Sequence, residues 1–217
     1  MSKPKVVLAT RNAHKVEEVS RILAADGANI ELVGLNEYPD AGDVIEDGAT
    51  FAQNAALKAE AAARHTGLPS IADDSGLCVD ALNGMPGVYS ARWSGQHGAD
   101  KANLDLVLAQ IADVPDDRRG AQFLCAAALA LPPRPDGAVE VRVVEGVVAG
   151  ELLRAPVGTG GFGYDPIFVP YGHDRTTAEM APEEKDAISH RGRALEALAP
   201  LLAGLGGCGC EGCACSA

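Results

Sequence analysis

Two adjacent carboxylates near the middle of the chain have the clearest potential for chemistry. They lie in Asp73-Asp74-Ser75-Gly76, between two short apolar pieces, Ser70–Ala72 and Leu77–Asp80. We therefore expect the pair at the end of a strand and not on an open surface. Neighbouring carboxylates repel each other, and Mg²⁺, which prefers one or two carboxylates with water and phosphate oxygens, relieves the repulsion. Asp74 could also accept a proton from an attacking water; the alternative is an acidic turn without a chemical role.

An acidic run without Lys or Arg precedes the alanine-rich stretch 51–65. Glu46, within this run, is a candidate for a second metal ligand. The other carboxylates fit a solvated loop better, because runs of like charge are usually solvated. The run comprises Glu37, Asp40, Asp43, Glu46 and Asp47.

A polar segment, Thr10-Arg11-Asn12-Ala13-His14-Lys15, joins a predicted strand to a predicted helix. The unpaired N–H groups and the positive dipole end of a helix N-terminus suit a phosphate. Asn12 can add a side-chain donor, and Lys15 a point charge. An ordinary strand-to-helix turn with a solvated lysine is the alternative.

The glycine-rich segment Gly158–Gly163 matches G-x-G-x-x-G but is not a dinucleotide fingerprint, because that motif must open a helix in a βαβ unit. Prolines and strand-forming residues follow it over 164–170, which predicts a loop closing over a ligand. Phe162 lies between two glycines in this loop. We expect its ring to stack on a flat ligand such as a base. For the other aromatic residues near glycine, filling gaps between loop and sheet is an equal alternative.

A cationic group, Ser189-His190-Arg191-Gly192-Arg193, lies at the start of a predicted helix. Cations are unfavourable at a helix N-terminus, so an anionic ligand would explain them. Arginine offers a fork of donors to a carbonyl or phosphate, and histidine offers one donor or acceptor. Charges that face solvent are the alternative. A serine hydrolase and a P-loop hydrolase are both excluded, because neither G-x-S-x-G nor G-x-x-x-x-G-K-[ST] occurs.

The elements that must position these residues come in a mixed order. Strands and helices alternate early, and a hairpin around the turn at 132–137 comes later, which predicts an α/β fold with a mixed sheet flanked by helices. Further strands are predicted over 5–9, 30–35, 121–131 and 139–148. Helices are predicted from Val16 to Gly27, over 51–65 with a Thr50–Gln53 capping box, over 100–112 and over 182–203 with Ser189 as a local cap. One domain over 1–206 is expected, followed by a Gly- and Cys-rich tail over 207–217 that we expect to be disordered.

The chain of 217 residues has a net charge of -12, which argues against nucleic acid and anionic membranes as partners. Its apolar runs fall short of the ~20 residues of a membrane span, and the first is too short for a signal-peptide core. Only Cys78 and Cys125 lie outside the tail, so no disulfide framework is expected. We expect a cytoplasmic protein.

Five segments together resemble one family, the inosine/xanthosine triphosphate pyrophosphatases, which hydrolyse non-standard purine nucleoside triphosphates. The segments follow the order of the family, and the resemblance extends over roughly residues 5–203. The matching segments are Leu8–Lys15, Ile71–Leu77, Pro86–Arg92, Gly160–Phe168 and Glu184–Gly192.

The resemblance implies an elongated, two-lobed α/β fold with a central mixed sheet. It also implies a homodimer, dependence on Mg²⁺, and cleavage of a nucleoside triphosphate such as ITP, dITP or XTP to the monophosphate and pyrophosphate. Donors from His190 or Arg191 to a 6-oxo group would then reject adenine, whose amino group cannot accept.

The resemblance also implies roles for individual residues. Asp74 would be the catalytic carboxylate and a metal ligand, with Glu46 as a loosely corresponding second ligand, and Lys15 would stabilise charge on the leaving oxygens. The phosphates would be held by Thr10, Arg11, Asn12, Ala13, His14, Lys15, Lys58 and Ser75. The base would be stacked on Phe162, lined by Gly163, Tyr164 and Asp165, and approached by Lys185, His190 and Arg191. One departure is Arg11, where the commoner family pattern has glycine.

Other functions remain open at this point. A related Maf-like nucleotide pyrophosphatase should lack the 162–165 and 189–192 segments. A non-catalytic nucleotide-binding module would not need the carboxylate pair. Cys208, Cys210, Cys213 and Cys215 form a C-x-C-x₂-C-x-C pattern that could bind a soft metal, although it is denser than common zinc sites.

Overall fold

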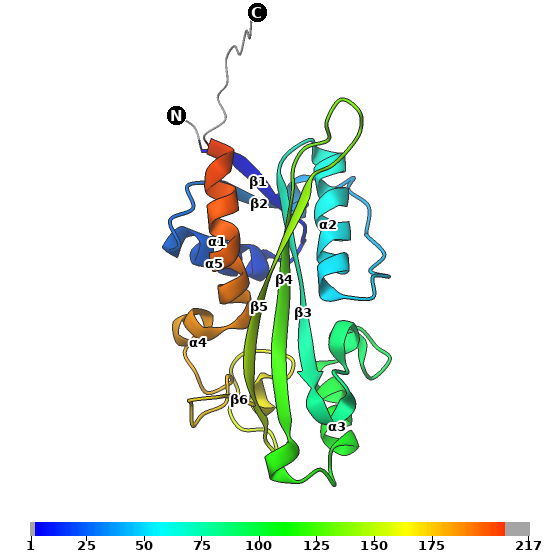
Figure 1. The fold of residues 1–217 in the computed structure, drawn as a ribbon, viewed down its shortest axis with the longest axis vertical. Coiled ribbons are helices and arrows are strands. Elements are labelled where there is room, and N and C mark those ends of the chain that lie inside the picture. The colour runs from blue at the N-terminus through cyan, green and yellow to red at the C-terminus, as the bar shows by residue number, and fades with distance from the viewer. Residues whose placement is uncertain (1–2, 207–217) are drawn as a thin grey trace, which may run out of the picture.

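The computed structural model describes residues 3–206, and its longest elements are three strands that run the length of the molecule (Figure 1). The expectations for the tail, both its disorder and metal binding by its cysteines, lie outside the described residues. Within residues 3–206, no helix is long and apolar enough to cross a membrane.

A six-stranded mixed sheet with the order β2-β1-β3-β4-β5-β6 forms the centre of the fold. β2, β1 and β3 are parallel to one another, whereas β3 through β6 pair antiparallel. This confirms the predicted α/β class with a mixed sheet, including the late hairpin, which is formed by β4 and β5. The strands are β1 (Lys5–Leu8), β2 (Glu31–Gly34), β3 (Ser70–Val79), β4 (Gly120–Ala130), β5 (Val141–Leu152) and β6 (Phe168–Pro170).

Helices cover both faces of the upper sheet in Figure 1: α1 and α5 lie on one side and α2 on the other. α3, α4 and β6 lie around the lower part of the long strands, so the molecule has two lobes. The helices are α1 (Ala13–Ala25), α2 (Phe51–Thr66), α3 (Asp100–Gln110), α4 (Pro182–Ile188) and α5 (His190–Ala203). Short 3₁₀ turns occur at Leu35–Glu37, Asp80–Leu82, Gly87–Arg92, Asp116–Arg118, Asp165–Ile167 and Gly204–Gly206.

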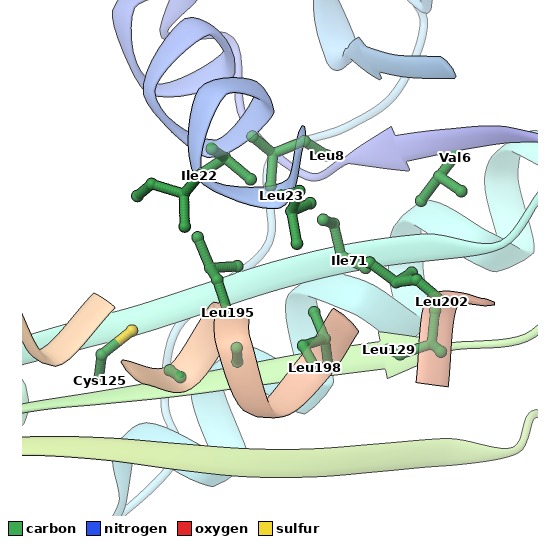
Figure 2. Close-up of a cluster of buried hydrophobic side chains, with 13 residues drawn as sticks. Val6, Leu8, Ile22, Leu23, Ile71, Cys125, Leu129, Leu195, Leu198 and Leu202 are labelled. Atoms are coloured by element: carbon green, nitrogen blue, oxygen red, sulfur yellow. The ribbon is translucent and has the colours of Figure 1, made fainter. Parts of the chain in front are cut away.

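The core differs in composition on the two faces of the sheet. Leucine, isoleucine and valine from α1 and α5 pack on one face (Figure 2). On the other face, Ala55, Ala59 and Ala63 of α2 are completely buried against alanines of β4. Small side chains at both surfaces allow a helix and a sheet to approach closely, which holds α2 near β3.

Local signals in the sequence fix where the helices begin. The Thr50 hydroxyl accepts the N–H of Gln53, and the Gln53 side chain accepts the N–H of Ala49, so α2 is capped as predicted. Ser189 accepts the N–H of Gly192 at 2.8 Å and caps α5. The predicted helical region 182–203 is therefore divided at Ser189 into α4 and α5.

The expectation that the two carboxylates lie at a strand end is wrong. β3 is continuous from Ser70 to Val79, and β4 pairs with it residue by residue along that whole length. The polar residues are tolerated because their backbone groups belong to this ladder while their side chains find partners on either side. Asp73 and Asp74 thus lie inside a long strand, in the part that contacts α1, α2 and α5.

Candidate active site

Asp73 and Asp74 contact opposite faces of the sheet, because successive side chains on a strand alternate. Asp73 contacts residues of α1 and α5, and Asp74 contacts residues of α2. The two carboxylates therefore do not face one common site, although Asp73 still adds to the raised pKa of Asp74. Each carboxylate has its own set of partners.

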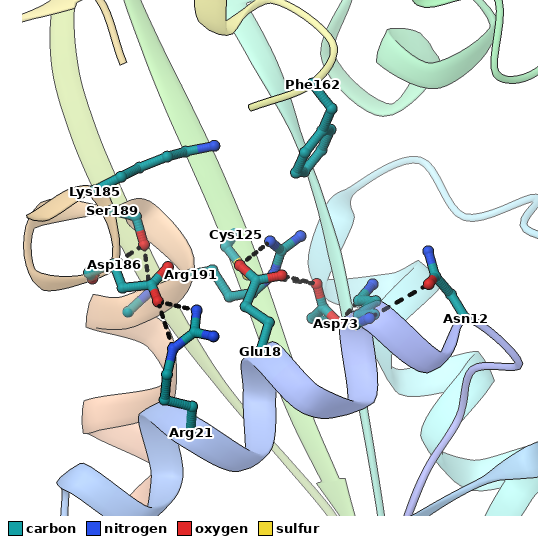
Figure 3. A network of polar contacts seen from close by, with 12 residues as sticks. Asn12, Glu18, Arg21, Asp73, Cys125, Phe162, Lys185, Asp186, Ser189 and Arg191 are labelled. Atoms are coloured by element: carbon teal, nitrogen blue, oxygen red, sulfur yellow. Dashed lines mark hydrogen bonds and ion pairs between the residues drawn. The ribbon is translucent and has the colours of Figure 1, made fainter. Parts of the chain in front are cut away.

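Asp73 is part of a buried ionic network that joins β3 to α1 and α5 (Figure 3). Lys15 Nζ lies 2.7 Å from Asp73 Oδ1, and Arg191 Nε donates to Asp73 Oδ2 at 3.2 Å. Arg191 Nη1 in turn donates to Glu18 Oε1 at 2.9 Å. Burial alone would raise the pKa of Asp73, but the charges of Lys15 and Arg191 outweigh it and lower that pKa. Asp73 is therefore ionised and anchors two cations.

Asp74 has partners on α2 and in its own strand. Its Oδ2 accepts a hydrogen bond from Asn54 Nδ2 at 3.0 Å, and its Oδ1 accepts one from the Ser75 N–H at 3.1 Å. Burial raises the pKa of Asp74, and Glu46 and Asp73 add to this effect against the opposing Lys58 and Asn54. A carboxylate with a raised pKa is a better proton acceptor than an ordinary aspartate.

Lys58 connects Asp74 with Glu46. Its Nζ lies 2.9 Å from Glu46 Oε1 and 3.7 Å from Asp74 Oδ1, so both carboxylates approach one positive charge. Among residues 3–206, no group of three or more His, Cys, Asp or Glu side chains could hold a metal. Two carboxylates suit Mg²⁺ bound together with substrate phosphates, because Mg²⁺ in such sites keeps water and phosphate oxygens as its other ligands.

The polar segment at the start of α1 is held in a defined turn. The Asn12 N–H donates to Thr10 Oγ1 at 3.2 Å, and Asn12 Oδ1 accepts the N–H of Lys15 at 3.4 Å. Asn12 thus caps α1, while Lys15 turns back to Asp73. Ala13 begins the helix, and the side chain of His14 lies outside the described part of the structure.

Two hollows receive most of the remaining candidates. A cavity of about 120 Å³ lies among β3, α1, α5 and the glycine-rich loop, and a wider cleft of about 830 Å³ lies beside α2. The cavity is lined by the candidates Ser75, Phe162, Gly163, Tyr164, Asp165, Lys185, His190 and Arg191. The cleft is lined by the candidates Thr10, Arg11, Glu46 and Lys58. The candidates for the base therefore line the cavity, whereas those for the phosphates are divided between the cleft, the cavity and positions outside both. Asp74 lines neither hollow but contacts Lys58, which lines the cleft.

The loop that carries Phe162 is shaped by Asp165, which the sequence placed among the residues lining the base. The Asp165 carboxylate accepts the N–H of Phe162 at 2.8 Å, the hydroxyl of Thr177 at 2.8 Å and the ammonium of Lys185. At Gly161, φ is +68° and a Cβ would lie 2.1 Å from Asp165 Oδ2, so only glycine fits. Asp165 is thus fully engaged in holding the loop.

Phe162 and Lys185, both drawn in Figure 3, line the cavity. The Phe162 ring is 60% exposed, and Lys185 Nζ lies 4.9 Å from its centroid. An exposed ring next to a cation is suited to stacking on a planar ligand.

His190 lies deeper in the cavity and stacks on Phe123 at a centroid distance of 4.9 Å. Burial lowers its pKa to about 3, and the charges of Arg191 and Lys185 contribute. The imidazole is therefore neutral at physiological pH, with one N–H donor and one acceptor. Arg191 also lines the cavity, but its guanidinium donates hydrogen bonds to Asp73 and Glu18. The expected donor Arg191 is therefore already bound within the protein.

Asn54, Glu18 and Asp100 were missed in the sequence. Asn54 lies four residues before the candidate Lys58 on α2, and Glu18 lies three residues after the candidate Lys15 on α1, so helical spacing could have paired them on one face. Asp100 was read only as the start of a helix, yet its carboxylate accepts the N–H of Gly163 at 3.0 Å. No signal in the sequence indicates that contact.

The resemblance implies that Phe162 stacks on the purine of a nucleoside triphosphate, so Phe162→Ala should raise the KM for that substrate by about 5- to 150-fold, since base–aromatic stacking contributes about 1–3 kcal/mol. The free energy of unfolding of the variant should change by less than about 0.5 kcal/mol, because Phe162 is largely exposed. Steady-state kinetics and urea unfolding measure the two effects. Tyr171→Ala, another exposed aromatic, is the matched control. An unchanged KM would remove Phe162 from the base site.

The chain is similar to known proteins over nearly its whole length. The model of the Ham1 family matches residues 6–201. A dITP/XTP pyrophosphatase of Streptomyces coelicolor is 61% identical over 198 residues, covering 91% of this chain and 96% of that protein. A dITP/XTP pyrophosphatase of Mycobacteroides abscessus is 56% identical over 202 residues, covering 93% of this chain and 96% of that protein.

Solved structures give the same result for the fold. The crystal structure of the nucleoside-triphosphatase / dITP/XTP pyrophosphatase of Mycobacterium abscessus has a TM-score of 0.74 and 56% identity, covering 90% of this chain and 99% of that one. The structure of the Ham1 protein of Staphylococcus aureus has a TM-score of 0.81 and 39% identity, covering 93% of this chain and 99% of that one. The resemblance deduced from five short segments is confirmed over nearly the whole described chain, and the protein belongs to the Ham1 family.

Proposed function

We propose that this protein is a Mg²⁺-dependent nucleoside-triphosphate pyrophosphatase that converts ITP, dITP and XTP to the monophosphate and pyrophosphate. The proposal depends on one observation: the residues suited to a base and those suited to phosphates lie in separate hollows near β3. The cavity with Phe162 and the neutral His190 suits a purine base, and the cleft with Lys58, Glu46 and Asp74 at its side suits phosphates. The names of the relatives, dITP/XTP pyrophosphatases, support the same activity. Such an activity would remove non-standard purine nucleotides from the nucleotide pool.

The chemistry assigned to this chain is the attack of water on a phosphorus of the triphosphate. Asp74 accepts the proton of the water, which its raised pKa favours. Lys58 and Lys15 stabilise negative charge on the phosphate oxygens, after exchanging contacts with Glu46 and Asp73 for contacts with the substrate. Asp74 and Glu46 would hold Mg²⁺, which when bound neutralises phosphate charge and acidifies water.

Selection of the base is assigned to the cavity. Phe162 stacks on the purine, and the neutral His190 and Lys185 supply hydrogen-bond donors near its edge. A 6-oxo group accepts from such donors, whereas the 6-amino group of adenine cannot, and buried donors left unpaired are costly. ATP is therefore the substrate that this site rejects.

The proposed homodimer follows from the family resemblance, and the proposed location agrees with the cysteine usage of the chain. We place the protein in the cytoplasm as a homodimer, with nucleotides as its ligands and neither nucleic acid nor membranes as partners. The net charge of -12 supports the last point, because it disfavours long polyanions while Mg²⁺ and local lysines accommodate a small one.

A substrate panel tests the proposed function. With Mg²⁺, we expect kcat/KM for ITP and XTP to exceed that for ATP by about 10²-fold or more, given the discrimination possible at a required hydrogen bond. Release of pyrophosphate, distinguished from phosphate, measures the reaction, and EDTA should abolish it. Equal rates with ATP and ITP would contradict the assignment of the cavity, and release of phosphate alone would contradict the reaction.

A further inference from the structure

The segment that carries Glu46 has no regular structure of its own. Residues 38–49 form neither helix nor strand, and their ends are tied to their neighbours in sequence. The Tyr38 N–H donates to the Leu35 carbonyl at 2.9 Å, and the Gly48 N–H donates to Asn54 Oδ1 at 2.8 Å. Between these ends, the position of the segment depends on side chains from other parts of the fold.

Arg11 supplies two of these contacts. Its Nη2 donates to the carbonyl of Ala41, and its Nη1 donates to Asp43 Oδ1 at 3.2 Å. Ala41 is only 7% exposed, whereas the side chain of Asp43 is 97% exposed. The sheltered bond to Ala41 therefore contributes more than the exposed ion pair.

The backbone of Arg11 is fastened to the same region. Its carbonyl oxygen accepts a hydrogen bond from Asn36 Nδ2 at 3.0 Å. Arg11 thus joins the loop at the start of α1, through both its side chain and its main chain, to the residues that follow β2. It does so at the wall of the cleft beside α2.

The other contacts to the middle of the segment come from different elements. Lys58 of α2 binds Glu46, and His65 Nε2 of the same helix lies 3.3 Å from Asp40. Arg92 Nη2 donates to the Glu46 carbonyl at 3.4 Å. The segment is therefore held between α2 and Arg92 on one side and the loop of Arg11 on the other, with Glu46 directed toward Lys58 and Asp74.

We infer that Arg11 is a positioning residue: it fixes the segment 38–47 against the loop Thr10–Asn12 and so keeps Glu46 close to Asp74. This role replaces the direct phosphate contact that the resemblance implied for Arg11. It rests on the proposed function, in which Glu46 and Asp74 act as the acidic pair. Glycine, which the commoner family pattern has here, has no side chain that could make these contacts.

Arg11→Met tests the inference in the full-length protein. Hydrogen exchange of the amides in residues 38–49 should become about tenfold faster without ligand, the factor expected for the loss of one hydrogen bond from a charged donor. The Mg²⁺ concentration for half-maximal hydrolysis of ITP should rise about tenfold, as for other residues that orient ligands. The KM for ITP at saturating Mg²⁺ should remain within about twofold. Arg11→Lys should give intermediate values, because one ammonium replaces the fork.

Asp43→Asn is the matched control, and it should match the unmodified protein within about twofold, since it removes only an exposed ion pair. A raised KM for ITP with unchanged exchange would overturn the inference in favour of a phosphate contact. Faster exchange with an unchanged Mg²⁺ requirement would also overturn it, since Arg11 would then only stabilise the segment. If the unmodified protein fails to hydrolyse ITP, the proposed function fails, whereas the exchange measurement still reports whether Arg11 holds the segment.

Discussion

Asp74→Asn is expected to lower kcat for ITP by about 10²–10⁴-fold, the range for loss of a general base. The amide has nearly the same shape but cannot accept the proton of the attacking water, and it removes the negative charge near Lys58. The free energy of unfolding should not fall, because a raised pKa means that the ionised carboxyl is disfavoured in the folded state. Initial rates of pyrophosphate release and urea unfolding measure both effects.

The dependence on pH provides a second measurement of the same residue. Activity requires ionised Asp74, so kcat should decrease in acid as this carboxylate becomes protonated. Asp47→Asn, which changes an exposed carboxylate of the acidic run, is the matched control and should retain both the rate and the pH profile. Near-normal turnover in Asp74→Asn would remove Asp74 from the mechanism.

Arg191→Met is expected to destabilise the protein by about 3–5 kcal/mol, because it leaves part of a buried ionic network uncompensated. Arg191 joins Asp73 of β3 to Glu18 of α1 from its place on α5, so its loss affects three elements at once. For a chain of this size, the melting temperature should fall by about 6–20 °C. Thermal and urea unfolding measure the change.

The loss of stability in Arg191→Met should become smaller as the pH falls. The pKa of Asp73 is lowered in the folded state, so its ionic contacts contribute fully above the unfolded pKa of ~3.9 and are lost as the pH falls through the folded value. The difference in free energy of unfolding between the unmodified protein and Arg191→Met should therefore become smaller in acid. Arg193→Met, on the same helix but exposed, is the control and should cost about 1 kcal/mol or less. Equal losses for the two variants would contradict a network role for Arg191.

Local patterns were sufficient for much of the fold. The capping box at Thr50, the cap at Ser189 and the β4–β5 hairpin depend on residues close together in sequence, and each was predicted correctly. The same reasoning failed at Asp73 and Asp74. A polar interruption of an apolar run suggested a strand end, but the pairing with β4, some fifty residues away, continues β3 through it.

The partners of the site residues were harder to predict than the residues themselves. The bond between Arg191 and Glu18 joins positions 173 residues apart, and nothing in their local sequence specifies it. Lys15 and Arg191 were expected to contact substrate, and in the structure both bind Asp73. Residue types and order indicate the kind of chemistry, whereas the ion pairs that hold the groups in place depend on how α1, α5 and β3 pack.

Successive side chains of β3 point to opposite faces of the sheet, so insertions and deletions within this strand are not tolerated. Inserting or deleting one codon between Ser70 and Asp73 would move each carboxylate to the opposite face while the pairing with β4 was kept. Asp74 would then approach Lys15 and Arg191, and Asp73 would lose both. The turn at 132–137, which joins two strands and has one exposed bond to α2 from Arg64 to the Gly137 carbonyl, can change length at lower cost. Length variation among functional versions of this protein should therefore be found in such turns and be absent from this strand.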